Sequence, residues 1–188
     1  KTVLVDGERI ENLVSQQTFF QGYETIDLKG AYLLPGLNDL HVHLALNGEP
    51  PKQRKDNEPV DYDKIYRMLT GNKLVRAIMK RRVASFAKTE VMSGVTTIRT
   101  VGGILDFDGQ IRDLINEGKL IGPRIIAANT AISVPGGHFA GSMAIAVKSP
   151  EEAKKLVRQI AETKPDIIKL MITGGVMDSD AEGMPGVL

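Results

Sequence analysis

The sequence predicts an α/β protein: the first half of a (β/α)8 TIM-type barrel, preceded by part of a small β-sandwich domain. Three observations support this fold class. Short apolar segments rich in β-branched residues alternate with segments of helical periodicity, which is typical of parallel sheets covered by helices. The apolar segments indicate strands that are buried on both faces. The first thirty residues instead predict short strands separated by turns.

The N-terminal segment, residues 1–30, predicts a partial small β-domain. Residues 2–5 and 8–14 have strand character, and the turn pair Asp6-Gly7 lies between them. Residues 23–28 alternate weakly and lead into a second turn at Lys29-Gly30. A segment of this size is too short to hold a core alone. We therefore expect one partial domain at 1–30 and a second domain at 31–188.

Residues 31–188 predict about four strand–helix units. The expected strands lie at 37–44, 95–98, 124–128 and 166–172. Helical spacing covers 62–93, with an interruption at Gly71 and an end at Gly94, and further helices are expected at 107–116 and from Ser149 to about Thr163. The last helix has the strongest start, because a serine cap is followed by proline and two acidic residues. Loops are expected at 47–61, at 129–148 (with room for a short helix) and from Gly174-Gly175.

Two architectures fit this strand–helix alternation: a doubly wound sheet and a (β/α)8 barrel. A doubly wound dinucleotide-binding fold shows G-x-G-x-x-G after its first strand, and no such motif follows Leu44. A complete barrel needs about 250 residues. Four units, the last without its helix, therefore correspond to half of a barrel.

The bulk composition excludes several classes of function. The chain is 42% hydrophobic and 25% charged with a formal net charge of +1, so neither nucleic acid nor a membrane surface is an expected partner. No apolar run approaches the roughly 18 residues of a membrane helix. The basic cluster Lys80-Arg81-Arg82 fits a solvated helix face. The absence of cysteine excludes disulfides and thiolate ligands.

The segment His41-Val42-His43 ends the first predicted barrel strand. Residues i and i+2 of a strand point to the same face, about 6.6 Å apart, so the two imidazoles could converge on one metal ion. The carboxyl ends of barrel strands are also where catalytic residues lie. A bare H-x-H also occurs by chance on exposed strands. Asp39 shares the same parity and could orient an imidazole, or it could be an ordinary polar residue at a strand start.

Lys169 lies in a predicted strand that otherwise contains isoleucine, leucine and methionine. Burial would lower the pKa of its amine, and a neutral amine can react with CO₂ to give a carbamate. The alternative is a lysine whose charged end extends from the strand into solvent.

Two more residues are candidates for binding substrate. His138 follows Gly136-Gly137 in the loop after the third strand, where glycines permit close backbone approach to a ligand. Arg99, at the end of the second strand, could hold a carboxylate through two hydrogen bonds or form a structural ion pair. The pairs Gly102-Gly103 and Gly174-Gly175 follow strand ends, where they could approach substrate or simply form turns.

The segment Ala31-Tyr-Leu-Leu-Pro-Gly-Leu-Asn-Asp-Leu-His-Val-His43 resembles the first metal-binding strand of the amidohydrolase superfamily. Segments 94–103, 122–126 with 136–138, and 166–175 resemble its imidazolonepropionase-like and Xaa-Pro dipeptidase (prolidase)-like branch. The resemblance spans nearly the whole chain. Asn38 replaces a commoner apolar residue. Thr100 stands where the family often has aspartate, so position 100 is given no catalytic role.

The resemblance implies a metal-dependent hydrolase of amide or peptide C–N bonds, with attack by metal-bound hydroxide. His41, His43 and Lys169 are the implied metal ligands, and Lys169 would be N-carboxylated and would bridge two divalent ions, Zn in the expected complete enzyme. His138 and Arg99 are the expected substrate-binding residues, and the expected substrate is a small amide or dipeptide. In the family, two further histidines and the acid/base aspartate end later strands.

None of those later groups is found in this sequence, so no catalytic residue is assigned. We expect the N-terminal part of a longer parent chain, with the true N-terminus missing, that is inactive alone and forms homo-oligomers or pairs with the missing C-terminal half. A cytoplasmic location is expected. The alternatives are an imidazolonepropionase-like cyclic-amide hydrolase, a deaminase (disfavoured by Lys169) and a non-enzymatic metal-binding or scaffold fragment.

Overall fold

The computed structural model describes residues 1–15, 20–48, 67–68 and 71–174. The chain divides into two compact units, Lys1–Pro35 and Gly36–Leu188. Predictions that fall on residues 49–66, 69–70 and 175–188 lie outside the described residues; they include most of the loop at 47–61, the start of the helical region at 62–93, and Gly175.

The first unit contains the predicted hairpin. Strands β1 (Thr2–Asp6) and β2 (Arg9–Val14) pair antiparallel around a turn at Gly7-Glu8, one residue later than the predicted pair Asp6-Gly7, with an irregularity between Leu4 and Val5. The second predicted turn also forms, because the Ala31 N–H donates to the Leu28 carbonyl at 2.9 Å. Residues 23–28 do not form the weak strand that their alternation indicated.

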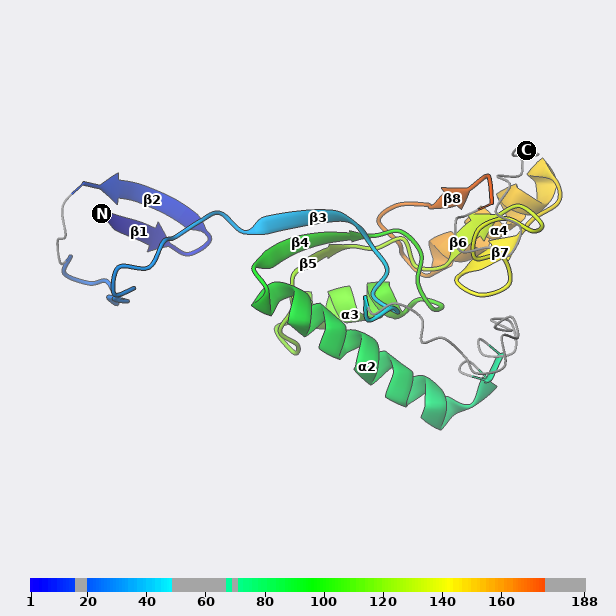
Figure 1. Ribbon diagram of the computed structural model, residues 1–188, viewed down its shortest axis with the longest axis horizontal. Helices are drawn as coiled ribbons and strands as arrows, with labels where there is room; N and C mark the ends of the chain where they lie inside the picture. The colour runs from blue at the N-terminus through cyan, green and yellow to red at the C-terminus, as the bar shows by residue number, and fades with distance from the viewer. Residues whose placement is uncertain (16–19, 49–66, 69–70, 175–188) are drawn as a thin grey trace. The chain divides into compact units, whose positions relative to one another are not determined.

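The second unit is a mixed α/β structure with two parallel sheets. Strands β3 (Leu37–Val42), β4 (Val95–Thr100) and β5 (Arg124–Ile126) form one sheet in the order β3-β4-β5, and all pairs are parallel. Helices α2 (Lys73–Met92) and α3 (Phe107–Asn116) connect these strands and lie against one face of the sheet (Figure 1). The strand–helix alternation predicted from the sequence is therefore present.

The second sheet corrects one prediction. We expected a loop with a short helix at 129–148, but this segment contains two three-residue strands, β6 (Ala131–Ser133) and β7 (Ala144–Ala146). The two strands pair with each other in parallel. β6 also pairs in parallel with β8 (Leu170–Met171), which gives the strand order β7-β6-β8. All three residues of β6 are buried, whereas only Ala144 of β7 is buried, and such short runs carry no periodic signal.

Two apolar clusters hold the helices to the sheets. Val83 and Ala87 of α2, with Phe107 and Ile111 of α3, pack on Ile98 of β4. Helix α4 (Pro150–Glu162) covers the second sheet, with Leu156 and Ile160 packed on Ile132 and Val147. The N-terminus of α4 is capped as predicted: Glu152 N–H donates to the Ser149 hydroxyl, and the Glu152 carboxylate accepts from the Lys148 N–H.

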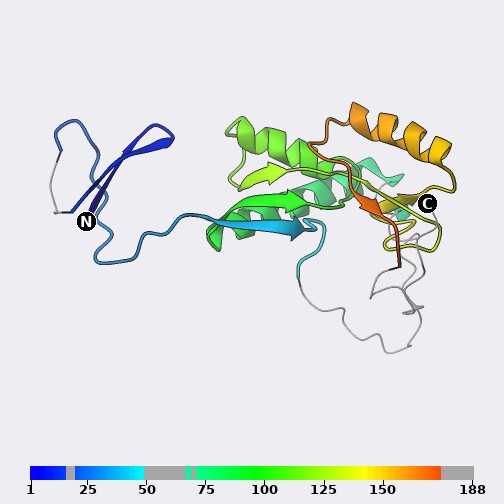
Figure 2. The ribbon, with the colours of Figure 1, turned by 90° about the horizontal axis from the view of Figure 1, so that it is seen from above.

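Burial of every strand on both faces was also predicted, and this is wrong for β3. Residues Leu37–His41 are exposed and only Val42 is buried. The physical reason is position: β3 is the edge strand of its sheet, and α2 and α3 cover one face alone (Figure 2). The fourth strand is also shorter than predicted, because only Leu170–Met171 of the segment 166–172 form a ladder.

Among the helices that the structure describes, none is long and apolar enough to cross a membrane.

Candidate metal centre

His41 and His43 lie at the carboxyl end of β3, as the sequence predicted. His41 belongs to the strand and is exposed, while His43 follows it and is half-buried. Their ring centroids are 5.5 Å apart and the ring planes meet at 66°. The alternation of a strand places residues i and i+2 on one side, so the two imidazoles are neighbours at the strand end.

The orientation of His43 is set by a backbone group. Its Nδ1 lies 2.9 Å from the carbonyl oxygen of Gly102, in the loop that follows β4. A carbonyl oxygen can only accept a hydrogen bond, so Nδ1 carries the proton and Nε2 keeps its lone pair. Metal-binding histidines show this arrangement, in which one ring nitrogen is held by a carbonyl and the other is free to ligate.

Three of the predicted site residues act on the pKa of His43. Burial lowers the pKa of His43, the hydrogen bond to Gly102 raises it, and the charges of His41, His138 and Lys169 lower it further. The net effect is a lowered pKa, which favours the neutral imidazole that a metal ion requires. The three groups that act on His43 include both other candidate ligands.

Lys169 immediately precedes β8 and is half-buried. Its backbone carbonyl accepts a hydrogen bond from the Ile132 N–H at 2.9 Å, which fixes the main chain of Lys169 beside β6. The sequence predicted a more deeply buried lysine inside a longer strand. The structure places Lys169 just before a two-residue strand, with its side chain partly exposed to solvent.

His138 lies in the loop between β6 and β7. Its N–H donates to the Thr173 carbonyl at 3.1 Å, and its own carbonyl accepts from the Ser133 hydroxyl at 3.1 Å. The imidazole contacts the Phe139 ring at a centroid distance of 4.1 Å, and Phe139 in turn lies 5.5 Å from the His43 ring. His138 is thus joined to the candidate centre through an aromatic side chain.

Arg99 and Asp39 make local contacts. The Arg99 Nε donates to the Leu40 carbonyl at 2.8 Å, which ties β4 to the strand that carries His41. The Asp39 carboxylate accepts from the His41 backbone N–H at 3.0 Å. The observed hydrogen bond of Asp39 therefore stabilises the backbone of the strand end and does not reach the imidazole.

The donor set fits part of a metal site. Within the described residues, no group of three or more histidine, cysteine, aspartate or glutamate side chains is placed to hold a metal ion. Two neighbouring imidazoles are present, and one has an Nε2 lone pair fixed by its second hydrogen bond. The Lys169 amine becomes an oxygen donor only after carboxylation. These residues could hold a divalent ion in part, and they do not form a complete coordination shell.

Three residues that support this region carry little or no signal in the sequence. Asn129 joins β5 to β6, is 1% exposed and has a φ of +57°. Asp108, in the first turn of α3, is 1% exposed, and among the described residues no hydrogen bond of good geometry reaches its two carboxylate oxygens. Phe139 links two of the histidines. An asparagine just after an apolar strand is a weak signal for a left-handed backbone; the other two carry no sequence signal.

The parallel strands and the two histidines at the carboxyl end of β3 give this chain the form of α/β enzymes that carry their functional residues at strand ends. Residues 32–184 match the amidohydrolase family. This chain belongs to that family.

The relatives of this chain are longer than the chain itself. It is 25% identical over 172 residues to an ochratoxinase from Aspergillus niger, covering 79% of this chain and 32% of the relative. A solved Xaa-Pro dipeptidase with methionine bound in its active site is 31% identical with a TM-score of 0.59, covering 81% of this chain and 37% of that one. The chain therefore spans about a third of these proteins.

A further solved structure shows the shared fold over more of the chain. A prolidase complexed with N-methylphosphonate-L-proline has a TM-score of 0.71 at 24% identity, covering 94% of this chain and 42% of that one.

Proposed function

We propose that this chain is the N-terminal half of a (β/α)8 barrel in a metal-dependent hydrolase that cleaves amide or peptide C–N bonds. The observation that supports it best is the hydrogen bond from His43 Nδ1 to the Gly102 carbonyl, because it leaves Nε2 free to bind a metal at the end of a barrel strand. Family membership supports the same assignment. The partial β-domain would comprise residues 1–30 and the half-barrel residues 31–188.

The proposed metal ligands are His41, His43 and Lys169, with Lys169 N-carboxylated and two Zn ions in the complete enzyme. The proximity of the two imidazoles supports the first two ligands. The position of Lys169 directly before β8, from which its charge acts on His43, supports the third. Divalent ions supply polarisation of the amide carbonyl and a water-derived nucleophile in such centres. The neutral His43 and its fixed orientation prepare this half of the site.

The proposed substrate is an Xaa-Pro dipeptide or a similar small amide. The solved Xaa-Pro dipeptidase, at 31% identity, supports this class. We assign the carboxylate of the substrate to Arg99, whose Nε bond to Leu40 holds the guanidinium beside the histidine-bearing strand. His138 is assigned to substrate contact because it lies next to Phe139 and acts on His43. The likeness to an ochratoxinase favours a second candidate, a hydrolase of ochratoxin.

We propose that the exposed sheet edges of this chain pair with the C-terminal half of the barrel or with a second copy of the chain. Leu37 and Leu40 are exposed on the edge strand β3, and Leu170 is exposed on β8. Exposed apolar residues on open sheet edges support pairing with further strands. No acid/base residue is assigned among the residues of this sequence.

The test is hydrolysis by the intact protein that contains this sequence. Xaa-Pro dipeptides, ochratoxin and a cyclic amide are supplied in parallel, before and after removal of metal by a chelator and after its return. We expect turnover of the dipeptides that is lost with the metal and restored with it. Turnover of ochratoxin alone would favour the second candidate. Turnover of the cyclic amide alone would favour an imidazolonepropionase-like enzyme. Metal-independent turnover, or none with metal present, would overturn the proposal.

A further inference from the structure

Asn129 lies at the point where the chain passes from the first sheet to the second. Strand β5 ends at Ile126 and pairs with β4, while β6 begins at Ala131 and pairs with β7 and β8. Asn129 is 1% exposed, and its φ of +57° turns the backbone between these two ladders. Asparagine is one of the few non-glycine residues that enter this left-handed region readily.

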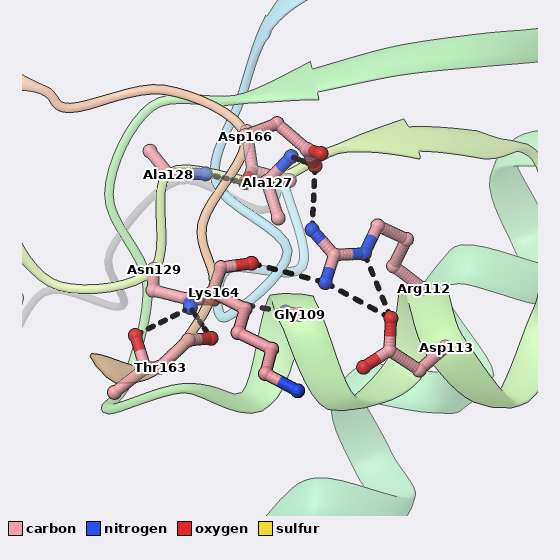
Figure 3. A network of polar contacts seen from close by, with 10 residues as sticks. Gly109, Arg112, Asp113, Ala127, Ala128, Asn129, Thr163, Lys164 and Asp166 are labelled. Carbon is pink, nitrogen blue, oxygen red and sulfur yellow. Dashed lines mark hydrogen bonds and ion pairs between the residues drawn. The ribbon is translucent and has the colours of Figure 1, made fainter. Parts of the chain in front are cut away.

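The backbone carbonyl, the side-chain oxygen and the side-chain nitrogen of Asn129 each form hydrogen bonds with a different segment of the chain. Its backbone carbonyl accepts from the Gly103 N–H at 2.9 Å. Its side-chain oxygen accepts from the Gly109 N–H, in the first turn of α3, at 2.8 Å. Its side-chain nitrogen donates to the carbonyl and the hydroxyl of Thr163, at 3.2 and 2.9 Å (Figure 3). The residue therefore joins the β4–α3 loop to the ends of two helices.

The β4–α3 loop is the segment that orients His43. Gly103, which donates to Asn129, directly follows Gly102, whose carbonyl accepts from His43 Nδ1. Gly102 has a φ of +129°, a conformation available to glycine, and a side chain there would lie 3.6 Å from the His43 ring. Residues 102 and 103 share one peptide plane, since the carbonyl of the first and the N–H of the second belong to the same rigid unit. A hydrogen bond to the N–H of that unit therefore fixes the direction of its carbonyl.

We propose that Asn129 is a positioning residue: it holds the Gly102–Gly103 peptide plane and thereby fixes the tautomer and ring orientation of His43. The inference rests on the proposed function only in treating His43 as a metal ligand. The bond geometry itself holds without any metal. Outer groups that orient a metal-binding histidine typically change metal affinity by about 10- to 100-fold when removed.

The test is carried out on the intact protein in two forms, metal-free and metal-loaded. In the metal-free form, histidine labelled with ¹⁵N in the ring reports which nitrogen of His43 carries the proton, with the resonance assigned by its loss in His43→Gln. In the metal-loaded form, competition with a chromophoric chelator gives the affinity for Zn²⁺. The key variants are Asn129→Gly, which keeps the backbone carbonyl and φ but removes the side chain, and Asn129→Asp, which keeps an acceptor for Gly109.

We expect Asn129→Gly to reduce the Nδ1-protonated fraction of His43 and to weaken Zn²⁺ binding by about 10-fold or more, with Asn129→Asp restoring much of both. Leu156→Ala is the control for stability, because it removes a buried side chain of α4 far along the sequence from the loop and should leave the His43 signal unchanged. An unchanged His43 resonance in both Asn129 variants would overturn the inference. So would a His43 signal that changes equally in Leu156→Ala.

The two proposals fail in different ways. If His43→Gln leaves Zn²⁺ affinity unchanged while Asn129→Gly still alters the His43 tautomer, the metal assignment fails and the positioning role holds. If His43→Gln abolishes Zn²⁺ binding while the Asn129 variants alter neither readout, the positioning role fails and the metal assignment holds.

Discussion

Gly103 and Asp108 lie so close that a Cβ atom on Gly103 would come within 2.5 Å of the Asp108 Oδ2. Contacts under about 3.0 Å are essentially never made by real Cβ atoms, so a side chain at position 103 would force the Asp108 carboxylate to shift. Asp108 is 1% exposed and has little room to move away. The packing of one carboxylate therefore sets the sequence requirement of the loop that orients His43.

The first prediction follows from this contact. Gly103→Ala is expected to lower the free energy of unfolding of the intact protein by about 1–3 kcal/mol, the usual effect of overpacking. Urea unfolding measures the change. The same substitution made in an Asp108→Ala background should cost less, because the clashing carboxylate is gone. Equal costs in both backgrounds would show that the two residues are not coupled.

The second prediction concerns pH. Burial raises the pKa of Asp108 from 3.8 to about 6, and the nearby Thr100 hydroxyl opposes this by a smaller amount. Because the native pKa lies above the unfolded value, the stability that Asp108 contributes is fully present below pH 3.8 and is lost as the pH rises through about 6. Asp108→Asn should therefore make stability less dependent on pH in this window. At pH 7 it should raise the free energy of unfolding relative to the native protein, by on the order of 1–3 kcal/mol. A destabilised Asn variant at pH 7 would contradict this account.

The third prediction concerns Arg112, whose side chain is 11% exposed and joins α3 to the segment before β8 (Figure 3). It donates to Asp113, to Asp166 and to the Lys164 carbonyl at 2.9, 2.7 and 3.1 Å. Arg112→Met, which keeps the aliphatic stem, should lower the free energy of unfolding by about 1–2 kcal/mol at pH 7, since Asp166 is partly exposed. Arg112→Lys should lose a smaller part, because lysine keeps the charge without the forked geometry.

The same ion pair has a pH signature. Burial would raise the pKa of Asp166, but the Ala127 N–H and Arg112 together lower it. Its contribution is therefore present above pH 3.8 and lost as the pH falls through the depressed native value. The difference in unfolding free energy between the native protein and Arg112→Met should shrink below about pH 4. A difference that is constant down to pH 2 would exclude the ion pair as its source.

The fourth prediction is that the purified 188-residue chain alone does not hydrolyse Xaa-Pro dipeptides at a measurable rate. It would offer His41, His43 and Lys169 but no acid/base group, and its described residues hold no larger metal-binding cluster. A steady-state assay with added Zn²⁺ and bicarbonate is the measurement. Turnover by this chain that scales with enzyme concentration would show that the half-barrel assignment is wrong.

The sequence predicted the periodic parts of the fold well, for physical reasons. The α4 helix has its start signal in four consecutive residues from Ser149, and the structure places the cap there. The hairpin of the first unit was equally local, because a single turn pair sets its register. Strands β6 and β7 were missed because three residues are too few to show a period. Their ladders are also not local, since β6 pairs with β7 across a loop and with β8 more than thirty residues away.

The candidate site divides in the same way. His41 and His43 could be singled out because they lie two residues apart at one strand end, so spacing alone places them together. The carbonyl that orients His43 comes from residue 102, and the asparagine that holds it from residue 129. Neither relationship is local in sequence. The burial of Asp108 could not be predicted because its local signal is misleading. An acidic residue in the first turn of a helix ordinarily indicates a favourable exposed charge.

The most direct test of the account is the metal content of the intact protein, purified in the presence of bicarbonate, for the native sequence, Lys169→Ala and Lys155→Ala. Lys155 is an exposed lysine of α4 and serves as the matched control. Elemental analysis should find two divalent ions per chain in the native protein and in Lys155→Ala, with a clear loss in Lys169→Ala. Equal metal content in all three proteins, or no bound metal in the native protein, would contradict the assignment of His41, His43 and Lys169 as one half of a two-metal site.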